Sequence, residues 1–511
     1  MTKPFTKSAF KIALECPSKL FYASQPEIYA NQNDDNDFLQ SLAEGGFQVG
    51  ELAKLYYHVD ADLKDIKGYD EAINATDELL KRDKVTIAEA AFRFDNLFVR
   101  ADIVVKDGDR IALIEVKAKS FDGDHGSFVA KRNPNSIASE HLPYLYDVAF
   151  QKYVLLQAKP QYQIHAYLMM ADKSKEADVD NLNQLFKLED INGRPSVSVH
   201  PNAQAILARS KEHVLTAFDV NELCDKIIAG KTDEQQSTMG MSFKEFVRLT
   251  SDAYCHQKYL SSLVGTKCFG CEYRSSDPNL KDGHKECWKH VAHFTDADFD
   301  RPQVEELWGA YIKRNDWIKK GIYFLDQVDE TDLAYACDNN DKPGLDHKQR
   351  KWLQIGLATK NESILSPFQD HLSGEAYLDK EGLREEMDSW IYPLHMIDFE
   401  TTAVALPYYK GMRPYEQVAF QFSHHIIDKN IDGTYSIRHA GQYLNEKVNE
   451  FPNFEFLREL KRQLETDKGS VFRYATHENT ILNKIREQLQ SSTEEDKEDL
   501  IADIAQALDA I

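Results

Sequence analysis

The chain has 511 residues, more than one hydrophobic core usually supports, so two or three domains are expected. A hydrophobic content of 42% with 11% aromatic residues argues against a disordered chain. The formal net charge of −23 disfavours a broad basic surface but leaves room for a local basic groove. No apolar run approaches the roughly 20 residues of a membrane span, and the first ten residues lack a secretory apolar core. We therefore expect a soluble cytoplasmic protein that has no membrane partner.

The apolar pattern divides the chain into a strand-rich first half, a helical middle and a second region with strands. In the first half, Asp-Asn and Asp-Gly-Asp segments separate three neighbouring strands and predict a meander of hairpins. The elements expected in this half are helices 5–25 and 38–58, strands 85–94, 97–106 and 110–118, loop 119–143, helix 144–157 and strand 162–170. Those expected further on are helix 241–261, a mostly helical stretch 300–390, and strands 394–400, 417–427 and 470–476. The whole predicts an α/β protein with domains at 1–292, 293–388 and 389–511.

Two acidic residues and a lysine stand on neighbouring predicted strands. Glu115 and Lys117 are two apart, so they point to one face, and a hairpin places Asp102 alongside. Phosphodiester hydrolysis uses this set: carboxylates hold Mg²⁺, the metal polarises the phosphate, and a lysine supports the nucleophile. The alternative is an ordinary surface strand with Glu and Lys facing water. Because charged residues are costly inside strands as apolar as 111–114, the pattern favours a site.

The segment Glu115-Val116-Lys117, with Asp102 before it, resembles the PD-(D/E)XK nucleases and specifically their RecB-like exonuclease branch. The resemblance implies a nuclease domain with a mixed central sheet, Mg²⁺ or Mn²⁺ as cofactor, and DNA that is single-stranded or has free ends as substrate. It implies that Asp102, Glu115 and the Val116 carbonyl bind the metal and that Lys117 orients the attacking water. Members of this branch carry a further ligand on a helix before the sheet, where this chain has Glu51.

The same branch has a Gln followed by a Tyr on a helix after the catalytic lysine. Gln151, followed by Tyr153, occupies that position, although the usual Gln-x-x-x-Tyr spacing is not met. A literal match to that spacing, Gln163 and Tyr167, falls on a predicted strand. We therefore interpret Gln151 as the catalytic residue of this motif.

A cysteine cluster follows the nuclease-like region. Cys268 and Cys271 are spaced as a Cys-x-x-Cys pair, and Cys287 lies downstream. Thiolates at this spacing chelate metals, and seven cysteines are too few for a disulfide scaffold in a chain this long. A zinc site needs a fourth ligand, for which His284 or His290 is available.

The order of the cysteines also resembles the iron–sulfur nucleases of the RecB-like branch. Those proteins have one cysteine before the nuclease core and three after it, as Cys16, Cys268, Cys271 and Cys287 stand here. The resemblance implies a 4Fe-4S cluster held by these four thiolates. Zinc and unligated thiols are the alternatives.

A second acidic constellation lies in the last predicted domain. Asp398 and Glu400 share one face of a predicted strand, and this segment resembles the first motif of DnaQ-type exonucleases of the RNase H-like fold. Glu478 lies in a region that resembles their second motif, and residues 407–425 resemble an uncharacterised domain found behind RecB-like nucleases in bacteria. No third acidic motif is visible, so either the chain is shortened or this possible second site is incomplete. We expect no separate activity from it.

These patterns together predict a metal-dependent nuclease that acts on DNA in repair, recombination or defence against foreign DNA. The alternatives are a catalytically inactive nucleic-acid-binding scaffold and a nuclease that acts on RNA. The intact set of Asp102, Glu115 and Lys117 favours an enzyme.

Overall fold

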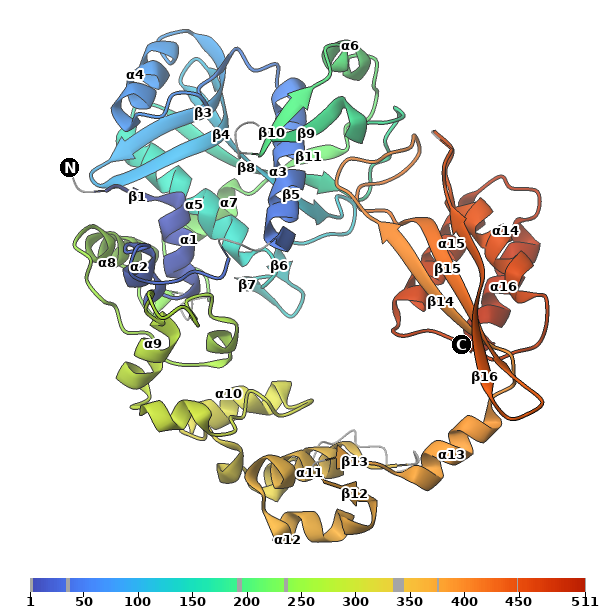
Figure 1. The fold of residues 1–511 in the computed structure, drawn as a ribbon. Coiled ribbons are helices and arrows are strands. Elements are labelled where there is room, and N and C mark those ends of the chain that lie inside the picture. Colours follow the sequence, from blue (N-terminus) through green and yellow to red (C-terminus); the bar gives the residue numbers. More distant parts are fainter. Residues whose placement is uncertain are drawn as a thin grey trace. The chain divides into compact units, whose positions relative to one another are not determined.

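The structure is a computed structural model, and it describes residues 3–33, 37–190, 195–233, 238–333, 344–374, 376–447 and 449–510. These residues form an α/β protein, as predicted, with a large mixed sheet and several smaller sheets (Figure 1). They group into two compact units. The first unit contains Met1–Lys11, Asp37–Ser251 and Trp390–Ile511, and the second contains Ile12–Asn36 and Asp252–Ser389. The domain boundaries after residues 292 and 388 stay a prediction.

The large sheet of the first unit is built on the predicted hairpin meander. Strands β3 (Lys84–Phe94), β4 (Leu97–Asp107) and β5 (Arg110–Phe121) pair antiparallel in this order. After helix α5 (Leu142–Ala158), strand β8 (Gln163–Asp172) returns parallel to β5. The predictions of three strands, a helix and a further strand are confirmed. Two short strands, β2 (Ala61–Asp62) and β11 (Leu215–Asp219), close the two edges of the sheet.

Strands β4 and β5 separate in the middle of the sheet. Their antiparallel ladder ends at the pair Ile103 and Ile114. The other end of β4 pairs instead with β1 (Phe5–Thr6), which runs parallel to it. The two strands therefore diverge from the next two residues in register, Asp102 and Glu115. We call this point of divergence the fork.

Two helices cover opposite faces of the sheet at this fork. Ile114 belongs to the same hydrophobic cluster as Leu52 of helix α3 (Asp37–Tyr56), which confirms the predicted helix 38–58. The next residue, Glu115, accepts a hydrogen bond from Gln151 of α5. Because consecutive residues of a strand point to opposite faces, α3 and α5 lie on opposite sides of β5 here.

The prediction of one helix over residues 5–25 was wrong. The segment contains β1, helix α1 (Lys7–Glu15) and helix α2 (Lys19–Ala23). Pro17 separates the two helices, because proline has no backbone N–H and disfavours a helical residue before it.

The prediction of a loop over 119–143 was also incomplete. Strand β5 continues to Phe121, and the strands β6 (Val129–Ala130) and β7 (Asn133–Ile137) pair with each other before α5 begins. Strand β6 has only two residues and β7 is mainly polar, so the sequence carried no apolar alternation to reveal them.

The second unit is mostly helical, and this confirms the prediction made for residues 300–390. Ser18 joins the segment Ile12–Asn36 to the rest of this unit. Its hydroxyl donates to the Leu260 carbonyl at 2.7 Å and accepts from the Ser262 N–H at 3.0 Å. The helix predicted at 241–261 is α8 (Phe243–Cys255), which runs from the first unit into the second. The helices that follow are α9 (Gly283–Val291), α10 (Tyr311–Lys319), α11 (His347–Thr359), α12 (Glu362–Leu365) and α13 (Lys380–Ser389).

The C-terminal part of the first unit has its own four-stranded sheet, in the order β16-β15-β14-β17. Strands β14 (Leu394–Thr402) and β15 (Val418–Lys429) confirm two predicted strands, whereas β17 (Val471–Phe472) is shorter than expected. Strand β16 (Tyr435–Leu444) was not predicted, because its largely exposed residues show no apolar alternation. One face of the sheet packs on the helices α14 (Asn453–Leu464), α15 (His477–Ser491) and α16 (Lys497–Ala510).

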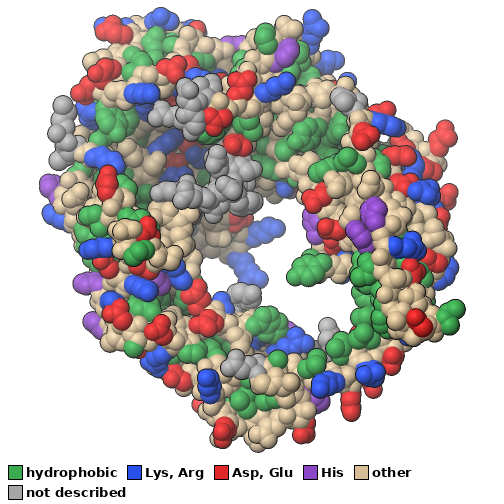
Figure 2. Space-filling view, in the orientation of Figure 1, with side chains coloured by type: hydrophobic (Ala, Val, Ile, Leu, Met, Phe, Trp, Pro, Cys, Tyr) green, Lys and Arg blue, Asp and Glu red, His purple; other side chains and the backbone are tan. Residues whose placement is uncertain are grey.

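Acidic and basic side chains are interspersed over the face of the molecule drawn in Figure 2. On that face, the acidic side chains are not gathered in one area. In the described part of the chain, no helix has both the length and the apolar character needed to cross a membrane.

Candidate active site

The predicted carboxylates lie together at the fork of the central sheet. One oxygen of Asp102, Oδ2, accepts a hydrogen bond of 2.8 Å from the Val116 N–H. The Asp102 carboxylate thus accepts a hydrogen bond from a backbone N–H of β5 just beyond the last backbone pair of β4 and β5. Glu115 is fully buried, with 0% of its surface exposed. A buried carboxylate needs nearby cations or donors, and the fork supplies both.

Two ammonium groups neutralise these carboxylates. Lys117 pairs with Glu115 Oε1, and its Nζ lies 3.1 Å from Asp147 Oδ2 on α5. The Nζ of Lys7 lies 3.1 Å from Asp102 Oδ1 and 3.2 Å from both carboxylate oxygens of Glu115. Lys7 is the first residue of α1 and follows β1 directly, so pairing of β1 with β4 positions it at the fork.

Helix α5 brings a second polar layer to the site. The Nε2 of Gln151 donates to Glu115 Oε2 at 2.7 Å and to Asp147 Oδ1 at 3.2 Å. Gln151 and Asp147 are one helical turn apart, so both side chains lie on the same face of α5. The Oε1 of Gln151 is buried and accepts no hydrogen bond from any described residue. A buried acceptor without a partner fits a site that takes up water or a hydrated ion.

Sequence reasoning missed Lys7 and Asp147. Lys7 stands in an ordinary Thr-Lys-Ser segment, and only the long-range pairing of β1 brings it to the fork. Asp147 does carry a signal, because an acid four residues before Gln151 shares its helical face.

The charges at the fork act strongly on one another. Burial and the charge of Glu115 raise the pKa of Asp102. Burial acts the same way on Glu115, but the ammonium groups of Lys117 and Lys7 outweigh it and lower the pKa of this carboxyl. Burial lowers the pKa of Lys7 and Lys117, but the carboxylates around them outweigh burial and raise it. Glu115 therefore holds its charge firmly, and Asp102 is the carboxylate that gains most from an added cation.

The donor set fits a magnesium or manganese ion. The Lys7 ammonium sits where the carboxylates of Asp102 and Glu115 converge, and it stands in for such a cation. Oxygen ligands are those that Mg²⁺ and Mn²⁺ prefer. Among the described residues, no three His, Cys, Asp or Glu side chains are arranged to hold a metal ion. The remaining ligands would be backbone oxygens, such as the predicted Val116 carbonyl, and water.

The structure does not bring Glu51 into contact with this group. Its Oε1 lies 2.8 Å from Lys54 Nζ and 3.4 Å from Lys64 Nζ. No hydrogen bond within the described chain joins Glu51 to Asp102 or Glu115, and α3 covers the other face of β5. The role of Glu51 as a metal ligand stays a prediction.

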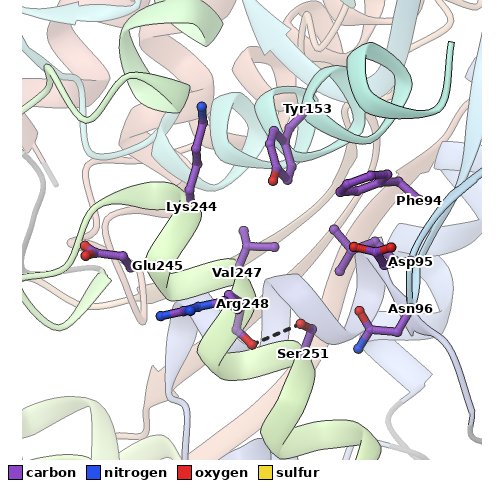
Figure 3. A pocket seen from close by; sticks show the side chains of 10 residues that line it. Phe94, Asp95, Asn96, Tyr153, Lys244, Glu245, Val247, Arg248 and Ser251 are labelled. Carbon is purple, nitrogen blue, oxygen red and sulfur yellow. Dashed lines mark hydrogen bonds between the residues drawn. The ribbon is translucent and has the colours of Figure 1, made fainter. Parts of the chain in front are cut away.

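Tyr153 does not accompany Gln151 at the fork. It lines a pocket of about 360 Å³ together with Phe94 of the β3–β4 hairpin and with Lys244 and Val247 of α8 (Figure 3). None of the residues predicted to be catalytic lines this pocket. Two residues along a helix are turned by about 200° from each other, so Gln151 and Tyr153 point in different directions.

The four cysteines predicted to hold a cluster all lie in the second unit. Cys16 follows α1, Cys268 and Cys271 lie in and just after a short turn (Thr266–Gly270), and Cys287 is on α9. None of the four forms a disulfide. Burial, with smaller contributions from the thiols of Cys287 and Cys16, raises the pKa of Cys268 to about 11. Cys16 is thus close enough to raise the pKa of Cys268, although the two residues lie about half the chain apart in sequence.

Donors and a cation surround these thiols. The Gly265 N–H donates to Cys268 Sγ at 3.4 Å, and the Tyr259 hydroxyl donates to Cys287 Sγ at 3.6 Å. The charge of the buried Lys19 lowers the pKa of Cys268, against the larger effect of burial. Hydrogen bonds and charge of this kind tune thiolate-bound iron clusters. Among the described residues, however, no three of these side chains are arranged to hold a metal ion, so the cluster stays a prediction.

The two histidines considered for zinc lie nearby in sequence but differ in environment. His284 is buried, its Nε2 has no hydrogen-bond partner among the described residues, and burial lowers its pKa to about 4. The ring of His290 packs edge-on against Tyr259 with centroids 5.2 Å apart. The choice between iron–sulfur and zinc therefore stays open at the level of geometry.

Among the described residues, the three acids of the possible second site are not arranged to hold a metal ion together. Asp398 and Glu400 are exposed on β14, while Phe399 between them packs into the core. Glu478 is buried at the start of α15, and its Oε2 has no hydrogen-bond partner among the described residues. The nearest link between strand and helix is Thr401 Oγ1, which lies 3.2 Å from the His477 ring. A catalytic role for these acids stays a prediction.

Comparison with known families gives one match. Residues 395–510, which run from β14 to α16, match a family described as "Domain of unknown function (DUF2779)". The match does not include the residues at the fork. Neither the search of curated proteins nor the search of solved structures found a protein that matches this chain.

Proposed function

We propose that this protein is a metal-dependent nuclease of the PD-(D/E)XK type, with its active site at the fork of the central sheet. One observation carries the proposal: Asp102 and Glu115 converge on a single cation position, which the Lys7 ammonium fills. A strand end that merely faces water would not bury Glu115 or surround it with Lys117 and Gln151.

We assign roles in metal binding or catalysis to residues at the fork. Asp102 and Glu115 would hold Mg²⁺ or Mn²⁺, with the Val116 carbonyl as a further ligand that the resemblance implies. Glu51, the other ligand that the resemblance implies, stands on α3, which covers the opposite face of β5. A divalent ion bound there polarises a phosphodiester and activates water for attack on phosphorus. Lys117 orients the nucleophile and offsets the charge that develops, and Gln151 fixes Glu115 by hydrogen bonding to its second oxygen.

The substrate we propose is DNA that is single-stranded or has a free end, processed in repair, recombination or defence against foreign DNA. This assignment rests on the RecB-like resemblance of the Glu115-Val116-Lys117 segment. Reduced cysteines fit a cytoplasmic protein, which is the compartment we propose. RNA as substrate and a catalytically inactive nucleic-acid-binding scaffold are the alternatives.

We also propose a 4Fe-4S cluster bound by Cys16, Cys268, Cys271 and Cys287. Two observations support this proposal. The four thiols lie in one unit and form no disulfide, and Cys16 is close enough to raise the pKa of Cys268 and of Cys287. Zinc is the alternative occupant of the same cysteines.

Cleavage of end-labelled single- and double-stranded DNA and RNA, with Mg²⁺, Mn²⁺ or EDTA, tests the nuclease proposal. Lys117→Ala should fold normally and cut at least about 100-fold more slowly than the wild type, because the lysine contributes to the chemistry more than to packing. Lys84→Ala is the matched control, since Lys84 is an exposed lysine at the far end of the β3–β4 hairpin. Wild-type cleavage by Lys117→Ala would contradict the proposal. A wild type that binds but never cuts would favour the scaffold.

A further inference from the structure

Two buried histidines form a chain of hydrogen bonds in the C-terminal sheet. His395 on β14 and His424 on β15 are each 1% exposed, and His395 Nδ1 lies 2.8 Å from His424 Nε2. The Nε2 of His395 lies 2.8 Å from Asp467 Oδ1, in the segment between α14 and β17. The Nδ1 of His424 lies 3.0 Å from Gln463 Oε1 on α14. Every ring nitrogen of the pair is therefore engaged, in one chain that runs from Asp467 to Gln463.

The Gln463 end of this chain is an acceptor. The Nε2 of Gln463 donates to Glu459 Oε1 at 2.7 Å and to the Gln442 carbonyl at 3.4 Å, so its Oε1 is the atom that faces His424. A reversed amide would place two acceptors 2.7 Å apart at Glu459. The hydrogen bond from Arg462 lowers the pKa of Glu459, so this carboxylate is charged and holds the amide in the orientation described.

The Asp467 end is an acceptor as well. Its Oδ1 also accepts from the Gly469 N–H at 2.8 Å. Burial alone would raise the pKa of Asp467, but Gly469 and His395 outweigh burial and lower the pKa. Three hydrogen bonds that join two acceptors through two rings need three N–H protons, and two neutral imidazoles have only two. The chain therefore holds one proton more than two neutral histidines.

The surrounding charges place this proton on His395. The Asp467 carboxylate contacts His395 directly and pairs with an imidazolium there. Burial, with smaller contributions from the charges of His395 and of Arg438 on β16, lowers the pKa of His424, while Gln463 and Asp467 act against it. His424 is therefore the neutral ring, which accepts from His395 and donates to Gln463.

Two glycines leave room for the ends of this chain. A Cβ at Gly441 of β16 would clash with the side-chain amide of Gln463. A Cβ at Gly469 would clash with the Pro393 carbonyl and lie 2.8 Å from His395 Nε2. Neither glycine has a positive φ angle, so close approach and not backbone conformation requires it. The backbone thus packs so tightly against both ends that a side chain would displace Gln463 or His395.

We propose that His395 is a buried imidazolium that locks α14 and the segment before β17 onto the C-terminal sheet, and that loss of its proton as the pH rises opens this lock. A neutral His395 keeps its donor for Asp467, so its Nδ1 must accept from His424. The Nδ1 of His424 then faces Gln463 Oε1 without a proton, and the link between β15 and α14 is the one that breaks. This inference does not depend on the proposed nuclease site.

Hydrogen–deuterium exchange of the full-length protein, measured by mass spectrometry, tests the inference. The folded segment holds one proton that the opened segment releases above the ordinary histidine value of about 6.5. The lock is therefore closed at lower pH and weakens as the pH rises. Between pH 6.5 and 9, opening of residues 453–472 should become easier by up to about tenfold per pH unit, after correction for the effect of pH on exchange itself.

Gln463→Leu removes the acceptor at one end, so two neutral rings satisfy the hydrogen bonds that remain. The pH dependence of this segment should then largely disappear. His425→Gln is the matched control, because His425 is an exposed histidine next to His424 on β15, and it should keep the full pH dependence. The inference is overturned if the wild type shows no such pH dependence, or if Gln463→Leu keeps all of it.

A second measurement covers the case in which Gln463→Leu folds poorly. Nuclear magnetic resonance of the wild type with ¹⁵N-labelled histidine reports which ring nitrogens carry a proton. At pH 7.5, where an ordinary histidine with a pKa of about 6.5 is mostly neutral, one ring next to another histidine ring should still have protons on both nitrogens. A single proton on every histidine ring at this pH would show that His395 is neutral and that the lock does not exist.

Discussion

The Lys7 ammonium lies 3.1 Å from the Asp102 carboxylate, although 95 positions separate the two residues in the chain. Strand β1 pairs with β4 immediately before Lys7, so the first turn of α1 enters the site at the point where β4 and β5 diverge. Without a metal ion, the chain neutralises its own carboxylates. A metal ion that binds between Asp102 and Glu115 would have to displace this ammonium.

Replacement of Lys7 by methionine should make folding depend on divalent ions. The variant keeps the apolar stem but leaves Asp102 and Glu115 without their shared cation. We expect the metal-free protein to lose roughly 1–3 kcal/mol of stability, because buried charged groups are left without a partner. Mg²⁺ should then raise the melting temperature more in Lys7→Met than in the wild type, since the ion binds the folded state alone.

Thermal melting in EDTA and in Mg²⁺ measures this difference. Lys81→Ala is the control, because Lys81 is an exposed lysine that pairs with the exposed Glu78. Equal effects of Mg²⁺ on Lys7→Met and on the wild type would show that Lys7 does not occupy a metal position.

Asp172 should contribute stability that is lost in acid. Its carboxylate accepts hydrogen bonds from the N–H of Gly123 at 2.9 Å, from the N–H and hydroxyl of Ser174 at 2.9 and 2.7 Å, and from the Thr216 hydroxyl at 2.7 Å. Burial alone would raise the pKa of Asp172, but these donors outweigh it and lower the pKa. A carboxyl whose folded pKa lies below its unfolded value stabilises the fold above the unfolded value, about 4. That stability is lost as the pH falls through the folded pKa.

Asp172→Asn should therefore cost about 1–2 kcal/mol at pH 7 and make the melting temperature less sensitive to pH below 4. Melting curves between pH 2.5 and 7 measure both effects. Asp124→Asn is the control, since Asp124 is exposed and directly follows Gly123 in the chain. If Asp172→Asn keeps the full acid sensitivity of the wild type, the hydrogen bonds do not hold this carboxylate ionised.

The C-terminal acids should have no activity of their own. Asp398 and Glu400 are exposed on β14, whereas Glu478 is buried, and within the described part of the chain the three are not arranged to hold a metal ion together. We expect Asp398→Asn to cut nucleic acid at the wild-type rate, and we expect Lys117→Ala to leave no second activity. A residual metal-dependent cleavage in Lys117→Ala that disappears in the double variant with Asp398→Asn would prove this expectation wrong.

The sequence revealed those parts of the site that depend on local structure. Asp102, Glu115 and Lys117 stand on adjacent strands of a hairpin meander, so alternation and turn signals were enough to bring them together. Gln151 was expected from the resemblance, which implies a Gln on a helix after the catalytic lysine, and helix α5 carries it.

Other parts of the site depend on relationships that leave no local pattern. Lys7 reaches the fork only through the pairing of β1 with β4, which joins residues about 90 positions apart. The helix of Glu51 was predicted, but its position on the other face of β5 follows from tertiary packing, and periodicity does not give this.

The last prediction concerns Cys16. An iron–sulfur cluster bound by Cys16, Cys268, Cys271 and Cys287 closes a loop of about 250 residues, and a single cross-link over a loop this long is worth on the order of 5 kcal/mol. The protein purified without air should be brown, with broad absorbance near about 400 nm from thiolate-bound iron. Cys16→Ser should lose the colour and melt several degrees lower, because ligation by the N-terminal segment holds the second unit together.

Cys255→Ser is the matched control, since Cys255 lies in the second unit but is not one of the four proposed ligands, and it should keep both colour and iron content. Zinc would give a colourless protein in which Cys16→Ser is nearly silent and His284→Ala or His290→Ala releases the metal instead. Iron and zinc contents of the anaerobic wild type, Cys16→Ser and the two histidine variants separate these cases. Cys16 is close enough to raise the pKa of Cys268 and of Cys287. We therefore expect Cys16→Ser to lose its iron and both histidine variants to keep it.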